Sequence, residues 1–169
     1  SIGPNLNVNL IPQANIARCQ AKVTAALLRC QETRQSEYAK CQKRGIRNGS
    51  ITDTASMQNV CLGTGFQPQP DPTGKLSEHC GGRIFYTVAI QCYGIDLTQA
   101  FSSCGASSVP GVANCLNRGT ACQLCRMLNE TAGFDRDCDQ FDDGVDNGSC
   151  NAECGDGLVH PEEACDDGN

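Results

Sequence analysis

Six aspartates lie close together between Phe134 and Cys150, and their side chains have the spacing of metal ligands. Carboxylate oxygens are the ligands that Ca²⁺ prefers, and one ion takes roughly six to eight oxygens. Carboxylates this close repel one another unless a cation or hydrogen-bond donors compensate their charge. The spacing therefore predicts a calcium site formed by Asp135, Asp137, Asp139, Asp142, Asp143 and Asp146.

This acidic segment does not have the pattern of an EF-hand. When Asp135 is counted as the first loop position, Gln140 stands where the turn glycine is required. A calcium loop of another shape is therefore expected, and the alternative is a solvated acidic linker. Cys138 and Cys150 favour the loop, because a linker does not need a covalent attachment at each side.

Besides metal binding, the sequence indicates disulfide formation, because it contains fourteen cysteines among 169 residues. The count is even, and two histidines supply a Cys/His zinc site poorly. Thiols stay reduced in the cytosol and pair in oxidising compartments. We therefore expect a secreted or cell-surface protein with up to seven disulfides, and a removed signal peptide would explain why the chain begins with Ser1.

Catalytic motifs are weak in this sequence. Cys122-Gln-Leu-Cys125 has the spacing of a redox pair, but it lacks the strand-then-helix setting of thioredoxin-like motifs. Structural bridging is the favoured interpretation of these two cysteines. Ser107, His79 and Asp96 match no signature of a catalytic triad. We therefore expect a protein that is not an enzyme and has no catalytic residues.

A long helix is expected from Asn15 to about Lys43, because this stretch contains neither Gly nor Pro. Cys19, Cys30 and Cys41 recur every 11 residues, which is close to three helical turns. The three sulfurs should share one stripe, too far apart to bridge each other. Each therefore needs a partner in another segment.

Shorter helices are predicted in the rest of the chain. One helix runs to Cys61 and is capped by Thr52 or Asp53, another begins at Asp96 and runs toward Cys104, and 108–130 begins with Ser108 before a proline. Residues 83–94 have apolar side chains at helical spacing, although their β-branched and aromatic content leaves a strand possible. The last helix carries Cys115, Cys122 and Cys125 on roughly one face, which makes that face the expected disulfide partner of the long helix.

The N-terminal residues 1–13 have a different pattern. Leu6, Val8 and Leu10 alternate with asparagines between two prolines, which predicts one short extended strand. A single strand cannot bury its apolar face alone. It either packs on its own domain or adds to the sheet edge of a neighbouring copy.

The charge is divided between two regions. Residues 1–133 hold 12 bases and 7 acids, a net charge of +5, and residues 134–169 hold 1 base and 12 acids, a net charge of −11. The whole-chain charge of −6 argues against nucleic acid as a partner. The basic region could instead contact an anionic glycan or the acidic end of another copy. No apolar run approaches the ~20 residues of a membrane helix, so membrane insertion is not expected.

The last residues, "CGDGLVHPEEACDDGN" at 154–169, resemble the cysteine-rich repeat of secreted and surface proteins of myxobacteria and related bacteria. The match covers Cys154 to Gly157 and then Glu162 to Asn169, and residues 121–150 show a weaker likeness to stretches upstream of such repeats. The resemblance implies an exported, modular, disulfide-rich protein. It also implies that the native polypeptide continues beyond Asn169.

The expected organisation is mainly α: an extended N-terminal strand, a disulfide-stapled helical domain and an irregular acidic cysteine-rich C-terminal module. The predicted segments are a tail at 1–13, the helical domain at 14–133, the calcium-binding loop at 134–151 and a truncated repeat at 152–169. We expect an extracellular structural protein, a subunit of a surface filament or similar assembly that self-associates through its N-terminal tail. The alternative is an adhesin or glycan-binding ectodomain with a shallow site on the Gly/Pro-rich loop 63–74.

Overall fold

The computed structural model describes residues 6–63, 69–145, 148 and 150, and for residues 6–12 it gives the backbone alone. Within these ranges the chain is mainly helical, as expected, and contains no strand. The elements are α1 (Leu6–Asn48), α2 (Thr54–Leu62), the π-helical η1 (Ser77–Gly82), α3 (Arg83–Gln91), α4 (Leu97–Ala100), the 3₁₀ turn η2 (Ser102–Cys104), α5 (Val109–Ala132) and α6 (Cys138–Asp143).

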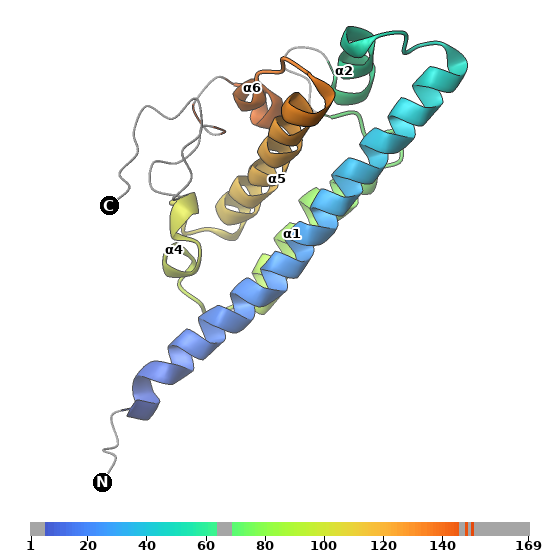
Figure 1. The fold of residues 1–169 in the computed structure, drawn as a ribbon. Helices are drawn as coiled ribbons and strands as arrows, with labels where there is room; N and C mark the ends of the chain where they lie inside the picture. The colour runs from blue at the N-terminus through green and yellow to red at the C-terminus, as the bar shows by residue number, and fades with distance from the viewer. Residues whose placement is uncertain (1–5, 64–68, 146–147, 149, 151–169) are drawn as a thin grey trace.

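The longest element, α1, runs along the whole molecule (Figure 1). At about 1.5 Å per residue, its 43 residues span about 65 Å. Both α3 and α5 contact α1, and α2 contacts it near its C-terminal end. The N-terminal turns of α1 extend beyond the other helices (Figure 1).

The predicted N-terminal strand is wrong, because residues 6–13 are the first turns of α1. A lone strand would leave its backbone N–H and C=O groups without partners, whereas a helix pairs most of them within the same segment. The alternation of asparagine with Leu6, Val8 and Leu10 was therefore a misleading signal. Residues 1–5 lie outside the described part of the chain.

The predicted starts of the three capped helices are confirmed, with Asp53 rather than Thr52 as the cap of α2, whereas α1 begins at Leu6 and not at Asn15. The Asp53 carboxylate accepts a hydrogen bond from the Ser56 N–H, and the Ser56 hydroxyl accepts one from the Asp53 N–H, so a complete capping box begins α2. The Asp96 carboxylate accepts from the N–H groups of Thr98 and Gln99 at the start of α4, and the Ser108 hydroxyl accepts from the Gly111 N–H at the start of α5. Residues 83–91 form a helix, so the strand alternative for that stretch is excluded.

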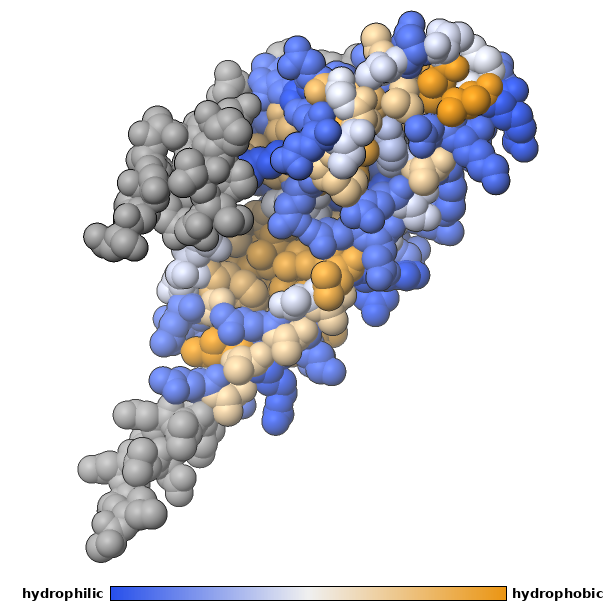
Figure 2. All heavy atoms as spheres, viewed as in Figure 1, coloured by the Kyte–Doolittle hydropathy of each residue, from blue (hydrophilic) through white to orange (hydrophobic). Residues whose placement is uncertain are grey.

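The hydrophobic core has two clusters. The first lies between α1, α3 and α5 and includes Val23, Ile84, Val88 and Val112. The second lies where α1, α2, α5 and α6 meet, and includes Leu62, Leu124, Leu128, Phe134 and Phe141. On the face shown in Figure 2, apolar residues gather between α1 and α5, and hydrophilic residues cover the outer side of α1.

Six disulfides join the cysteines of the described residues, and none of those cysteines is free. The stripe on α1 is confirmed: its three cysteines bond to α2, to η1 and to the residue that follows α3. The pairs are Cys19–Cys92, Cys30–Cys80, Cys41–Cys61, Cys104–Cys115, Cys122–Cys150 and Cys125–Cys138. The three bridges of α1 are nested, so each loop encloses the next.

The expectation that the cysteines of α5 would bond to those of α1 is wrong. The segment formed by η1 and α3 lies along the cysteine stripe of α1 and supplies two of the three partners. Where α5 meets this stripe, it presents the Thr120 hydroxyl, 3.2 Å from the sulfur of Cys30. The cysteines of α5 instead bond to nearby segments on either side of their own helix.

Residues 134–143 pack onto the helical body. Phe134 and Phe141 are buried in the second core cluster, and the Phe134 ring meets Tyr38 of α1 edge to face. Cys138 and Cys150 bond to α5. The expected boundary near residue 133 thus marks a change of charge within one packed structure. The predicted repeat at 152–169 lies outside the described residues.

The disulfide pairing predicts the number of reactive thiols. Because twelve of the fourteen cysteines are paired, a thiol-specific mass tag on unreduced, denatured protein should label at most two, Cys154 and Cys165. Peptide mapping without reduction should recover the six pairs. The same protein after reduction, which should take up fourteen labels, is the control. Four or more labels on the unreduced chain would contradict the disulfide scaffold.

Candidate functional site

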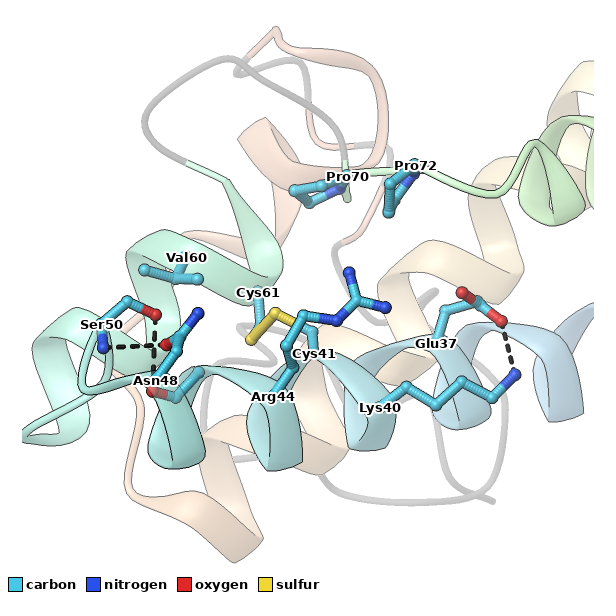
Figure 3. A pocket seen from close by; sticks show the side chains of 11 residues that line it. Glu37, Lys40, Cys41, Arg44, Asn48, Ser50, Val60, Cys61, Pro70 and Pro72 are labelled. Carbon is cyan, nitrogen blue, oxygen red and sulfur yellow. Dashed lines mark hydrogen bonds and ion pairs between the residues drawn. A yellow bond between two sulfur atoms is a disulfide. The ribbon is translucent and has the colours of Figure 1, made fainter.

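A pocket of about 210 Å³ opens between α1, α2 and the segment that begins at Gln69 (Figure 3). Polar side chains of α1 line one side, and Val60, Pro70 and Pro72 line the other. The disulfide between Cys41 and Cys61 lies beside it and fixes α2 against α1. This is the described feature that best fits a small-molecule site, because it combines apolar walls with a few converging polar groups.

The polar side of the pocket follows from helical spacing. Glu37, Lys40, Arg44 and Asn48 succeed one another at intervals of three or four residues, so they lie along one face of α1. Cys41 belongs to the same face, and its bond to Cys61 decides which element covers that face. The two prolines opposite have restricted φ angles, which stiffens the segment that closes the pocket.

Glu37 is a buried carboxylate with two side-chain partners. Lys40 Nζ donates to its Oε1 at 2.8 Å, and the Thr73 hydroxyl donates to its Oε2 at 3.2 Å. The hydrogen bond from Lys40 lowers the pKa of Glu37 below its ordinary value, and it outweighs the opposing effect of burial. Glu37 is therefore ionised at neutral pH.

Arg44 supplies the pocket with a positive charge that remains accessible. Its side chain rises from α1 toward the two prolines (Figure 3). Within the described residues it makes no ion pair, whereas Lys40 in the same pocket is paired with Glu37. A guanidinium presents its N–H donors in a planar fork that matches a carboxylate. The pocket is thus suited to an anionic group.

A second polar cluster lies one turn earlier on α1, around Arg34. Arg34 is 8 % exposed, and its guanidinium donates to Thr120 Oγ1 and to Asn117 Oδ1, each at 2.9 Å. Burial lowers the pKa of Arg34 to about 10. The Gln69 amide donates to the Arg34 carbonyl at 2.9 Å, which ties the start of the proline segment to α1. Arg34 therefore positions the wall of the pocket.

Sequence reasoning missed Arg34, Glu37 and Arg44, which look like ordinary charges on a solvated helix. The spacing of Glu37 and Arg44 was a usable signal, because seven residues bring two side chains to one helix face. What covers that face depends on Cys61 as the partner of Cys41, and spacing alone did not determine that partner. Pro70 and Pro72 of the wall belong to loop 63–74, on which a shallow site was expected, and binding there stays a prediction.

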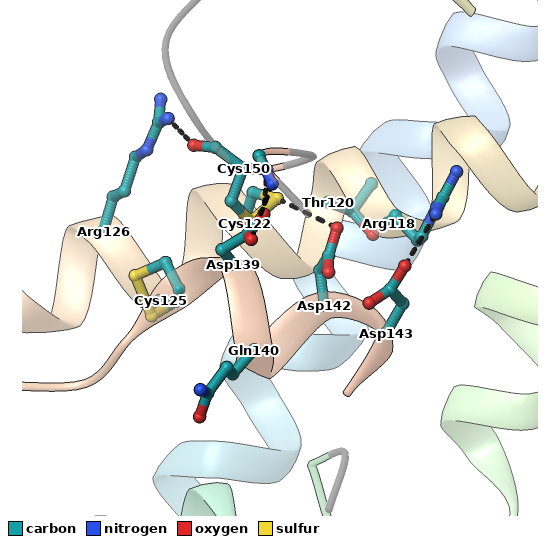
Figure 4. Close-up of a disulfide and its surroundings, with 12 residues drawn as sticks. Arg118, Thr120, Cys122, Cys125, Arg126, Asp139, Gln140, Asp142, Asp143 and Cys150 are labelled. Carbon is teal, nitrogen blue, oxygen red and sulfur yellow. Dashed lines mark hydrogen bonds and ion pairs between the residues drawn. A yellow bond between two sulfur atoms is a disulfide. The ribbon is translucent and has the colours of Figure 1, made fainter. Parts of the chain in front are cut away.

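Three carboxylates of the acidic segment accept backbone hydrogen bonds: Asp137, Asp139 and Asp143, of which Figure 4 shows the last two. Asp137 caps α6 and accepts from the N–H of Asp139 and of Gln140. Asp139 is buried and accepts from Gly148 N–H at 2.7 Å and from Cys150 N–H at 2.9 Å. These N–H groups stabilise the negative charge without a cation.

The other predicted calcium ligands lie in different surroundings. Asp143 accepts from Arg118 at 2.7 Å, and Asp142 Oδ2 lies 3.6 Å from the sulfur of Cys122. Asp135 is exposed, and Asp146 lies outside the described residues. Among the described residues, no three of these aspartates bring their oxygens within 4.8 Å of one another. Calcium binding by the segment stays a prediction.

One group of metal-ligating residue types does converge in the described part of the chain. Cys122, Asp142 and Cys150 place one atom each within 4.8 Å of one another. The two sulfurs are joined in a disulfide, so neither is a thiolate, the form in which cysteine binds metals. In its oxidised form this group is a structural bridge beside a carboxylate.

The pKa of Glu37 predicts a pH-dependent contribution to stability. A lowered pKa in the folded state means that the ionised carboxylate stabilises the fold above the ordinary value of 4.5, and that this contribution disappears as the pH falls through the folded pKa. We expect Glu37→Gln to lower the free energy of unfolding by about 1 kcal/mol at pH 7 and by much less at pH 3. Urea unfolding at both pH values measures this difference.

Glu32→Gln is the matched control, because Glu32 lies on the same helix and its side chain is 69 % exposed. It should change stability little at either pH, since exposed ion pairs contribute little. An equal loss for Glu37→Gln at pH 7 and at pH 3 would contradict the assigned role.

Calcium binding is tested by hydrogen exchange in the presence and absence of a chelator. If the aspartates hold an ion, its removal should speed exchange in residues 134–150, because a bound ligand stabilises the state that binds it. The middle of α1, fixed by its disulfides, should not change. Equal exchange of residues 134–150 in both conditions would rule the calcium site out.

Comparison of the chain with protein families, curated proteins and solved structures finds no match. In the part of the chain that the structure describes, no helix has the length and apolar composition of a membrane span. The number of disulfides is compatible with an extracellular location. The functional argument therefore depends on the geometry of the chain itself.

Proposed function

We propose that this protein is a non-enzymatic extracellular structural protein, a subunit of a surface filament or a similar assembly. The observation that carries the proposal is the covalent attachment of α1 to three other segments at intervals of 11 residues. These attachments cover about 33 Å of helix at 1.5 Å per residue. A long element held in this way suits a unit that keeps its shape inside a larger assembly.

Exposed apolar side chains on α3 and just after it also support the proposal. Tyr86 and Ile90 lie one turn apart on α3, and Tyr93 follows two residues after the end of that helix; they are 64 %, 66 % and 90 % exposed. They lie away from Ile84 and Val88, which are buried against α1 and α5. Large apolar side chains collected on one face are typical of contact surfaces between proteins.

The N-terminal turns of α1 are the proposed connector between copies. They extend beyond the other helices as a helix, so the contact would be helical rather than an added strand (Figure 1). Isolated helices are marginally stable in water, and packing against a neighbour stabilises them. The opposite charges of residues 1–133 and 134–169 further favour contact between unlike ends of two copies.

A second candidate function is binding of a glycan by an adhesin-like ectodomain. The observation that favours it is the pocket beside Arg44, with an accessible cation, a buried carboxylate and two prolines. The two functions do not exclude one another, because the pocket and the N-terminal turns of α1 involve different parts of that helix.

Assembly is tested with the double variant Leu6→Asp and Leu10→Asp. Charges in the connector should prevent higher-order species, while the disulfide-linked body keeps its helical circular dichroism. Size-exclusion chromatography with light scattering and negative-stain microscopy measure the outcome. The matched control is Asn7→Asp with Asn9→Asp, which adds the same charge without removing apolar side chains and should still assemble.

Two results would contradict this proposal. A parent protein that stays a monodisperse monomer up to millimolar concentration would exclude the structural assembly. A double variant that assembles like the parent would exclude the N-terminal turns as the connector, and the exposed side chains of Tyr86, Ile90 and Tyr93 would then be the next to substitute.

A further inference from the structure

We propose that the pocket between α1, α2 and the proline segment binds an acidic sugar, a single pyranose ring that carries one carboxylate. This inference rests on the second candidate function, glycan binding, and it names the class of glycan. It does not depend on assembly of the protein.

The charge of the pocket is the first reason. Lys40 and Arg44 contribute two positive charges, and Glu37 contributes one negative charge, so the lining has a net charge of +1. Asp71 lies between the two prolines in the sequence but does not line the pocket, and its carboxylate accepts hydrogen bonds from the N–H groups of Leu76 and Ser77. One carboxylate on the ligand would neutralise the site.

Arg44 is the group that would contact that carboxylate. It makes no ion pair within the described residues, and Figure 3 shows its side chain directed into the space beneath the prolines. The neighbouring bond between Cys41 and Cys61 holds this part of α1 against α2. A fixed helix presenting an accessible guanidinium favours a bidentate contact, which is the strongest kind that a carboxylate makes with a side chain.

The remaining lining matches the two other properties of a sugar. Val60, Pro70 and Pro72 offer an apolar wall for the C–H face of a pyranose. Each oxygen of Glu37 accepts one hydrogen bond from a side chain and has capacity for a ligand hydroxyl. At about 210 Å³ the pocket is smaller than the roughly 300–1,000 Å³ of sites for drug-sized ligands, so it suits one ring.

The test is a calorimetric and NMR titration of the full chain with methyl glucuronide, with methyl glucoside as the neutral counterpart. We expect the glucuronide to bind at least about tenfold more tightly than the glucoside, because only it carries the carboxylate. Arg44→Gln should weaken glucuronide binding about tenfold. Val60→Glu, which adds a negative charge to the opposite wall, should weaken it as strongly while leaving Arg44 in place.

Arg47→Gln is the matched control, since Arg47 is an exposed base on the same helix that does not line the pocket. It should leave binding unchanged, and circular dichroism should show that every variant is folded.

Three results would overturn the proposal: equal binding of both sugars, unchanged binding after Arg44→Gln, or displacement of the glucuronide by equimolar acetate or an acidic peptide. Loss of sugar binding with assembly intact would leave the structural role standing.

Discussion

The three disulfides of α1 are the constraint on which the rest of the structure depends. A helix of 43 residues has more surface than a small core can cover, and the chain has few aromatic residues. Each bridge supplies roughly 2–4 kcal/mol by restricting the unfolded chain. Each also places one particular segment on one turn of α1. Both core clusters and the pocket form where those segments are held.

Arg34 shows how the body accommodates a charge between its two core clusters. The guanidinium is buried, and its hydrogen bonds go to neutral acceptors on α5. Such burial carries a desolvation penalty, which hydrogen bonds reduce but do not remove. In return, the cluster joins α1, α5 and Gln69 at one point. The interface between the clusters is therefore fixed by directional contacts, whereas each cluster is held by apolar packing.

Local features of the fold could be predicted and distant pairings could not. Asp53, Asp96 and Ser108 mark helix starts because a cap depends on residues only two or three positions away. The partners of the α1 cysteines depend on which helix lies beside the stripe, and spacing does not contain that information. For the same reason spacing could place Glu37 and Arg44 on one face of α1 but could not tell which segment covers that face. The strand prediction failed because alternation near Leu6 carries no information about a partner strand.

The nesting of the α1 bridges sets the order in which their cysteines can pair. If the chain enters an oxidising compartment from its N-terminus, Cys19, Cys30 and Cys41 arrive first, and their partners follow in the reverse order, Cys61, Cys80 and Cys92. Cys41, the last of the first three cysteines to arrive, is therefore the first whose partner, Cys61, becomes available. The bridges can then form in the order Cys41–Cys61, Cys30–Cys80 and Cys19–Cys92, from the innermost loop to the outermost. Among the described residues, no bridge crosses from this set to the cysteines that follow, so oxidation of the N-terminal half can finish before α5 arrives.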